Sequence, residues 1–129
     1  MSIQEIGIEG EKKARIFLKN LGYKIFQIDW MADKDGNYIQ CEVKFKERFT
    51  PPPFEGHGME IWKIKDRLRF EKQTGIKAFL IIFEKLTDLI FYQWLLKLEQ
   101  GKYFDTKNDI RIYPLENFKT GIKTWEVQQ

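Results

Sequence analysis

The sequence predicts an α/β domain in which a mixed β-sheet is flanked by helices on both sides. Apolar residues recur at helical spacing in two segments, 4–21 and 59–74. Two segments of alternating polarity are joined by Asp35-Gly36, a strong hairpin signal. Residues 76–83 are apolar throughout, which is typical of a strand buried on both faces. The resulting order of helix, strands, helix, strands is that of a layered α/β sandwich.

The composition indicates one folded domain spanning residues 1–129. This length gives a single core, and the 43% of hydrophobic and 16% of aromatic residues exclude a disordered chain. The net charge of +3 permits a polyanionic partner without requiring one. A single cysteine cannot form an internal disulfide, and neither a signal peptide nor a membrane span is recognisable. We therefore expect a cytoplasmic protein without a membrane-embedded part.

The first half of the chain is expected to form a helix and a hairpin. The helix covers about 4–21 and ends at Gly22, a residue type favoured just after a helix. The hairpin strands are expected at 23–32, "YKIFQIDWMA", and 37–46, "NYIQCEVKFK". Their two-residue turn fixes which residues face each other across the pair.

The predicted register sorts the side chains of the hairpin onto two faces. It sets Asp33 opposite Tyr38 and Asp29 opposite Glu42. One face carries the apolar residues Ile28, Trp30, Ala32, Ile39, Cys41, Val43 and Phe45. The other carries Asp29, Asp33, Tyr38, Gln40, Glu42, Lys44 and Lys46.

The second half is expected to supply a basic helix and the remaining strands. Three prolines predict a loop over Phe49–Gly58. A basic amphipathic helix is expected over Met59–Thr74, with Gly75 at its end. Beyond the buried strand at 76–83, the patterns predict a strand at 88–92, a helix at about 93–100 and a strand at 109–113, and leave the tail unassigned. Trp30, Trp62, Phe79 and Phe83 are expected in the core because each lies on an apolar stripe.

The polar face of the hairpin points to phosphodiester chemistry. Asp29 and Glu42, about 5 Å apart at Cβ, would repel each other unless a divalent cation lies between them. Such a cation neutralises a phosphate and makes water nucleophilic. Lys44, next on the same face, would orient that water or stabilise the phosphate, and the Val43 carbonyl is a further ligand. Glu11 leans inward from the first helix and would complete the metal shell.

These residues resemble the PD-(D/E)XK nuclease superfamily. "GIEGEKKARIFLKNLGY" resembles the first helix of its Holliday-junction-resolvase-like members, with Glu11 at the helix acid. "DWMADKDGNYIQCEVK" resembles the metal-binding hairpin, with Asp29, Glu42 and Lys44 on the motif. The resemblance implies a restriction-endonuclease-like core and an endonuclease that cleaves DNA with Mg²⁺ or Mn²⁺. Asp33 shares the face of Asp29 and is the alternative metal-binding aspartate.

The partner predicted from this resemblance is DNA, including branched DNA. Resolution of a Holliday junction is one form of the activity and needs a homodimer that presents two sites to two strands. Phosphate contacts are predicted for Lys46, His57, Lys63, Lys65, Arg67 and Arg69. Two alternatives remain: a solvated strand face in which Glu42 and Lys44 pair with each other, and a non-catalytic nucleic-acid-binding or assembly module that retains the fold.

Overall fold

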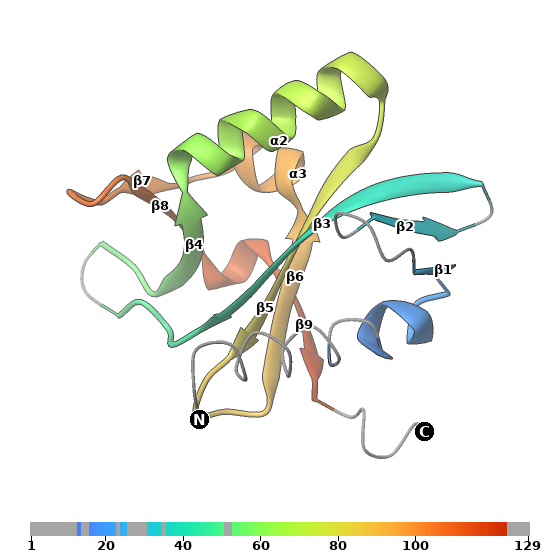
Figure 1. Cartoon of the computed structure of the whole chain (residues 1–129). Coiled ribbons are helices and arrows are strands. Elements are labelled where there is room, and N and C mark those ends of the chain that lie inside the picture. Colours follow the sequence, from blue (N-terminus) through green and yellow to red (C-terminus); the bar gives the residue numbers. More distant parts are fainter. Residues whose placement is uncertain are drawn as a thin grey trace.

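The computed structural model describes residues 13, 16–22, 24–25, 31–34, 36–50 and 53–123. Within these residues the main sheet has six strands, and one neighbouring pair, β3 and β5, is parallel while the others are antiparallel. Across the sheet the order is β1 (Lys24–Ile25), β2 (Met31–Lys34), β3 (Asn37–Lys46), β5 (Lys77–Glu84), β6 (Leu89–Trp94) and β9 (Lys119–Ile122). The predicted mixed sheet is confirmed (Figure 1).

A second sheet and the helices pack beside it. The second sheet has the order β4 (Gly56–Glu60), β8 (Ile110–Pro114) and β7 (Phe104–Asp105). The helices are α2 (Ile61–Thr74), α3 (Leu95–Gln100) and a 3₁₀ turn (Leu115–Asn117), and residues 16–20 are also helical. No helix in these parts of the chain has the length and apolar character needed to cross a membrane.

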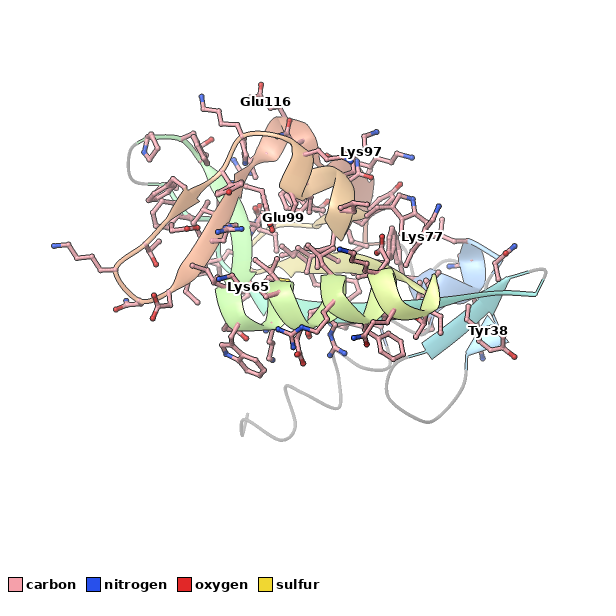
Figure 2. All side chains as sticks on the ribbon, turned by 90° about the horizontal axis from the view of Figure 1, so that it is seen from above. Tyr38, Lys65, Lys77, Lys97, Glu99 and Glu116 are labelled. Atoms are coloured by element: carbon pink, nitrogen blue, oxygen red, sulfur yellow. The ribbon has the colours of Figure 1, made fainter. Side chains whose placement is uncertain are left out.

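Strand β5 is the centre of the core because both of its faces are buried. Phe79, Ile81 and Phe83 pack in one apolar cluster with Leu18 of the helical segment 16–20. Ala78, Leu80 and Ile82 pack in the other with residues of α2 and α3. Figures 1 and 2 show α2 and α3 side by side on this second face. Helices therefore flank both faces of the sheet, as predicted.

The hairpin register is confirmed wherever the structure describes it. Met31 pairs with Gln40 and Asp33 with Tyr38. Cys41, on the apolar face, is 2% exposed, and burial raises the pKa of its thiol to about 12. The predicted continuous strand 23–32 is wrong, because Lys24 of β1 pairs antiparallel with Asp33 of β2, so the chain reverses between these two strands.

The predicted loop Phe49–Gly58 is also partly wrong, because its last three residues begin β4. This strand pairs with β8, and Gly56 and Gly58 permit an unusually close approach of the two backbones. A Cβ atom on Gly58 would lie 1.7 Å from the Arg111 carbonyl oxygen. Gly56 and Gly58 are therefore required by the packing of β4 against β8.

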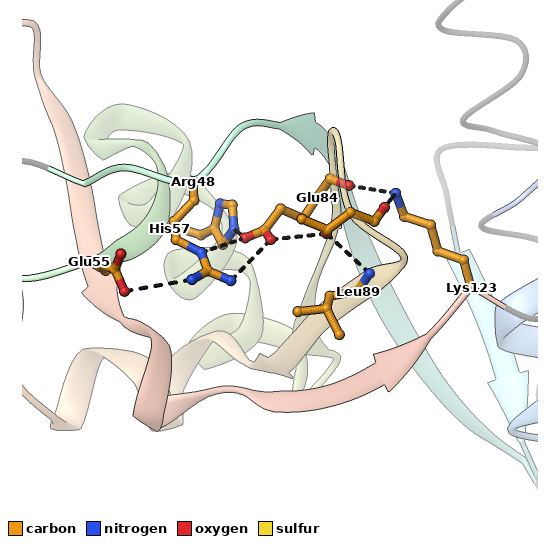
Figure 3. Close-up of polar contacts among 7 residues, drawn as sticks. Arg48, Glu55, His57, Glu84, Leu89 and Lys123 are labelled. Atoms are coloured by element: carbon orange, nitrogen blue, oxygen red, sulfur yellow. Dashed lines mark hydrogen bonds and ion pairs between the residues drawn. The ribbon is translucent and has the colours of Figure 1, made fainter.

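A buried polar cluster links β4 to the main sheet (Figure 3). Glu84, at the end of β5, is 1% exposed and accepts hydrogen bonds from Arg48 Nε (3.1 Å), His57 Nε2 (2.6 Å) and Thr87 Oγ1 (3.0 Å). Lys123 donates to the Glu84 carbonyl oxygen at 2.5 Å. Burial raises the pKa of Glu84, but its hydrogen bonds outweigh burial and hold the pKa below the usual 4.5.

His57 is part of this cluster, which corrects the predicted phosphate contact. Its side chain is 1% exposed and its Nε2 is bound to a carboxylate, so His57 is not a surface contact for the phosphate backbone. Burial lowers the pKa of His57 below 6.5, although Glu84 acts in the opposite direction. The ring is therefore neutral at pH 7, with Nε2–H donating to Glu84 and Nδ1 deprotonated.

We predict that His57 makes stability depend on pH below about pH 7. The unfolded chain takes up a proton below pH 6.5 that the folded chain does not, so the free energy of unfolding should fall as pH falls, by up to about 1.4 kcal/mol per pH unit. Urea denaturation of wild type and His57→Gln at four pH values checks this. His57 is the only histidine in the sequence, so the variant should lose the slope in this window. An unchanged slope would show that another group titrates.

Candidate functional site

The polar residues of β3 face α2 and β4, not open solvent. Gln40 begins the row, and its side-chain amide donates to the backbone carbonyls of Arg67 (2.9 Å) and Ile76 (3.1 Å). The side chains of Glu42 and Lys44 are each 14% exposed. Gln40, Glu42 and Lys44 therefore lie in a half-buried seam between β3 and the crossover formed by β4 and α2.

Glu42 is paired with α2. One of its carboxylate oxygens accepts a hydrogen bond from Arg67 Nη2 at 3.3 Å. Glu42 also acts on Lys63, one helical turn before Arg67: burial lowers the pKa of Lys63, but Glu42 and Glu60 raise it above 10.5. Glu42 thus faces two cations of the helix.

Lys44 is paired with Glu60, the residue that joins β4 to α2. The Lys44 ammonium lies 2.9 and 3.1 Å from the two carboxylate oxygens, and Lys63 Nζ lies 3.2 Å from one of them. Burial raises the pKa of Glu60, but Lys44 and Lys63 bring it down to about 2. Sequence reasoning missed Glu60 because it was assigned to the first turn of a helix, where an acid is favoured by the helix dipole alone.

Lys46 extends the row toward the end of β3. Its ammonium lies 3.4 Å from the Gly58 carbonyl oxygen. Burial lowers the pKa of Lys46, and the neighbouring Lys44 and Lys63 lower it further. We call Lys44, Lys46, Lys63 and Arg67, with the carboxylates of Glu42 and Glu60, the β3–α2 charge cluster. Its four cations exceed its two carboxylates, so the cluster is suited to an anion such as a phosphodiester.

The predicted metal ligands are only partly described. Glu11 and Asp29 lie outside the described residues, and so does the side chain of Asp33, whose backbone is in β2. Val43 packs its side chain on the opposite, apolar face, and its backbone pairs with Ile81. The described residues contain no group of three or more His, Cys, Asp or Glu that would hold a metal ion. The carboxylate and carbonyl oxygens of Glu42 and Val43 are of the type that Mg²⁺ prefers.

The basic residues of α2 were predicted to act together, but they lie on different sides of the helix. Arg67 faces β3, where it pairs with Glu42, and Lys63 lies near enough to Glu42 for this carboxylate to raise its pKa. Lys65 lies on the other flank, near Asp105. Arg111 is the main cause that lowers the pKa of Asp105, and Lys65 lowers it slightly further. Arg69 is exposed and pairs with Asp66 at 3.3 Å.

Trp62 corrects a further prediction. It is 64% exposed and does not belong to the core, and Lys63 Nζ lies 5.6 Å from the centre of its ring. The apolar stripe of α2 is instead carried by Ile64, which is fully buried, and Leu68.

Comparison with known proteins identifies the fold. No family model matches the sequence, and no curated protein sequence matches it. Among solved structures, Hjc of Archaeoglobus fulgidus, a Holliday junction resolvase from an archaeal hyperthermophile, is similar with a TM-score of 0.59. The match covers 87% of this chain and 86% of that chain at 11% sequence identity. The chain therefore has a fold similar to that of this resolvase, and the predicted restriction-endonuclease-like fold is confirmed.

Proposed function

We propose that this protein is a metal-dependent endonuclease that hydrolyses phosphodiester bonds in DNA, including branched DNA. The observation that carries the proposal is the placement of Glu42 and Lys44 side by side on β3 in a half-buried seam. A solvated Glu-x-Lys pair would be exposed and would stabilise the fold by only about 0.5 kcal/mol. Here each residue has its own partner across the seam, Arg67 for Glu42 and Glu60 for Lys44.

The residues proposed to bind Mg²⁺ or Mn²⁺ are Asp29, Glu42, Glu11 and the carbonyl of Val43. A bound divalent ion would neutralise charge on the phosphate and lower the pKa of a water molecule. Lys44 is proposed to orient the attacking water and to stabilise the phosphate charge. Glu60 is proposed as a positioning residue, because it accepts two hydrogen bonds from the Lys44 ammonium and so restricts where that ammonium lies.

The alternative function is a non-catalytic nucleic-acid-binding or assembly module. The observation that favours it is that both charges of the Glu-x-Lys pair are already neutralised, Glu42 by Arg67 and Lys44 by Glu60. In this alternative the seam only fixes α2 to the sheet. The two functions differ in whether DNA is cut, so cleavage assays separate them.

We predict that Glu42→Ala and Lys44→Ala each lower the rate of DNA cleavage at least about 100-fold while DNA binding stays measurable. Chemistry depends on these two groups, whereas affinity depends mostly on phosphate contacts elsewhere. The assay uses labelled linear, nicked, flapped and four-way DNA with Mg²⁺ or Mn²⁺ and with chelator. Glu116→Ala and Lys97→Ala, on exposed residues away from the seam, are matched controls that should keep the wild-type rate (Figure 2).

Two results would contradict this assignment. Cleavage at the wild-type rate by either seam variant would remove Glu42 or Lys44 from the catalytic site. If the wild-type protein binds these DNAs but cuts none of them with either metal, the binding-module alternative is supported.

We predict that Asp29→Asn removes the stabilisation of the protein by Mg²⁺. In chelator the variant should be more stable than wild type by roughly 0.2 to 1 kcal/mol, because it relieves the predicted repulsion with Glu42. In millimolar Mg²⁺ only a protein that binds the ion gains RT ln(1 + [L]/Kd). Thermal melts of wild type, Asp29→Asn and Asp33→Asn in both conditions test this. If Asp33→Asn instead abolishes the Mg²⁺ shift, Asp33 is the metal-binding aspartate.

We predict that the β3-facing flank of α2 contacts DNA phosphates. Replacing Lys63 and Arg67 together by Ala should lower the slope of log K against log salt by about one to two units, since each neutralised phosphate contributes about 0.9. A Lys72→Ala/Lys97→Ala double variant removes the same charge from exposed positions outside the seam and should leave the slope near that of wild type. Equal losses for the two double variants would indicate an effect of net charge alone.

A further inference from the structure

A pocket of about 360 Å³ lies directly beyond the β3–α2 charge cluster, where β3 ends. Its walls come from the end of β3 and the following residues, from β4, and from β8 with the turn that precedes it. The volume lies at the small end of the range for small-molecule sites. Lys46 belongs both to the charge cluster and to the pocket wall, so the two are continuous.

We infer that this pocket binds a single unpaired nucleotide of the DNA strand whose scissile phosphate lies at Glu42 and Lys44. The inference rests on the proposed function and adds a substrate class to it: DNA with an unpaired base beside the cleavage position, as at a flap, a single-stranded end or a branch point. A base inside an intact duplex is stacked and paired, and it would have to leave the helix to enter the pocket.

The first argument is the spacing of charge along β3. Lys46 follows Lys44 by two positions on the same face, which is about 6.8 Å along a strand. A phosphate held at Lys44 therefore has a second cation beside it, at the entrance of the pocket. The Lys46 ammonium lies 3.4 Å from the Gly58 carbonyl oxygen, and Glu60 attracts it without forming an ion pair, so among the described residues no carboxylate within ion-pair distance competes with a phosphate.

The second argument is the chemistry of the pocket wall. Phe49, Ile110 and Ile112 provide an apolar surface, and every nucleobase has a face that stacks on an aromatic ring. Asn108 lies on the rim, and its side-chain amide has no hydrogen-bond partner in the described part of the chain. The Thr106 hydroxyl accepts from the Asn108 and Ile110 backbone amides at 3.3 and 3.2 Å, so its own hydrogen remains to be donated. An apolar wall with such polar groups at its edge suits a nucleobase.

The third argument is an unsatisfied atom. His57 also lines the pocket, and its Nδ1 is buried without a hydrogen-bond partner among the described residues. Because Nε2 donates to Glu84, Nδ1 is an acceptor. A buried acceptor without a donor is unfavourable, and a water molecule that bridges Nδ1 to an N–H or O–H group of a bound nucleotide would satisfy it.

The binding test uses 2′-deoxyadenosine 5′-monophosphate as the probe, with the full chain in chelator, followed by NMR. We expect saturable shifts of the Asn108 side-chain amide and of the Thr106 backbone amide. Deoxyadenosine has the nucleoside of the probe without the phosphate, and inorganic phosphate has no nucleoside. Each should bind at least about tenfold more weakly than the monophosphate. Phe49→Ala should weaken binding of the monophosphate by roughly five- to 150-fold, the range for loss of one stacking contact.

Asn108→Ala provides a second variant whose folding is not at risk, because this exposed side chain holds no other residue of the described chain. It should weaken binding about fivefold, the effect of one hydrogen bond. Lys107→Ala is the matched control: it lies in the same turn, removes a positive charge and is not part of the pocket wall. Equal weakening by Lys107→Ala and Asn108→Ala, or equal affinity for inorganic phosphate and the monophosphate, would overturn the inference.

Cleavage assays separate this inference from the proposed function. If the protein cuts DNA, it should cut flapped DNA faster than fully paired DNA of the same sequence, and Asn108→Ala should reduce that ratio. Equal cutting of both substrates, unchanged in Asn108→Ala, would overturn the nucleotide subsite and leave the nuclease assignment intact. If no DNA is cut, the proposed function fails, while the NMR result in chelator still decides whether the pocket binds a nucleotide.

Discussion

The parallel pairing of β3 with β5 is the constraint on which the rest of the structure depends. Because β5 is buried on both faces, the strand beside it must also present one face to each layer. The apolar residues of β3 enter one core, and its polar residues are directed beneath the crossover formed by β4 and α2. A parallel pair requires such a crossover, and the crossover converts a polar strand face into an enclosed seam.

Burying charges in that seam is unfavourable unless each has a partner, and the chain provides one in each described case. Glu42 and Lys44 are paired with groups of the crossover, and Glu84 has three side-chain donors. The seam and the Glu84 cluster lie on the same face of the main sheet and both involve β4 or the residue that ends it. The same polar contacts that orient the candidate site therefore also attach the small sheet to the large one.

The sequence predicted those parts of the fold whose signals are local. Asp35-Gly36 determined the hairpin register, the apolar run at 76–83 identified β5, and Gly75 marked the end of α2, where it has φ of 77° and donates to the Glu71 carbonyl. β4 was missed because the three prolines before it predict a loop over the whole segment Phe49–Gly58, and only pairing with β8, far along the chain, makes residues 56–58 part of a strand.

For the candidate site, too, the sequence predicted the residues with a local signal and missed those that depend on distant contacts. Glu42 and Lys44 were predicted to share a face because the two-residue period of a strand is a local property. Glu60 was not found, because its role depends on a contact with Lys44 across 16 positions of sequence. His57 was expected at the surface and is buried, since the position of a glycine-flanked histidine is decided by the element that packs over it.

The burial of Cys41 provides a reporter within the strand that carries the site. It is the only cysteine in the sequence, it precedes Glu42, and both its shielding and its raised pKa prevent the thiolate from forming in the native state. A thiol reagent in solution can therefore react with it only when β3 separates from its neighbours. The rate of labelling measures how often that separation occurs, so the local opening of the site strand can be timed without introducing a probe.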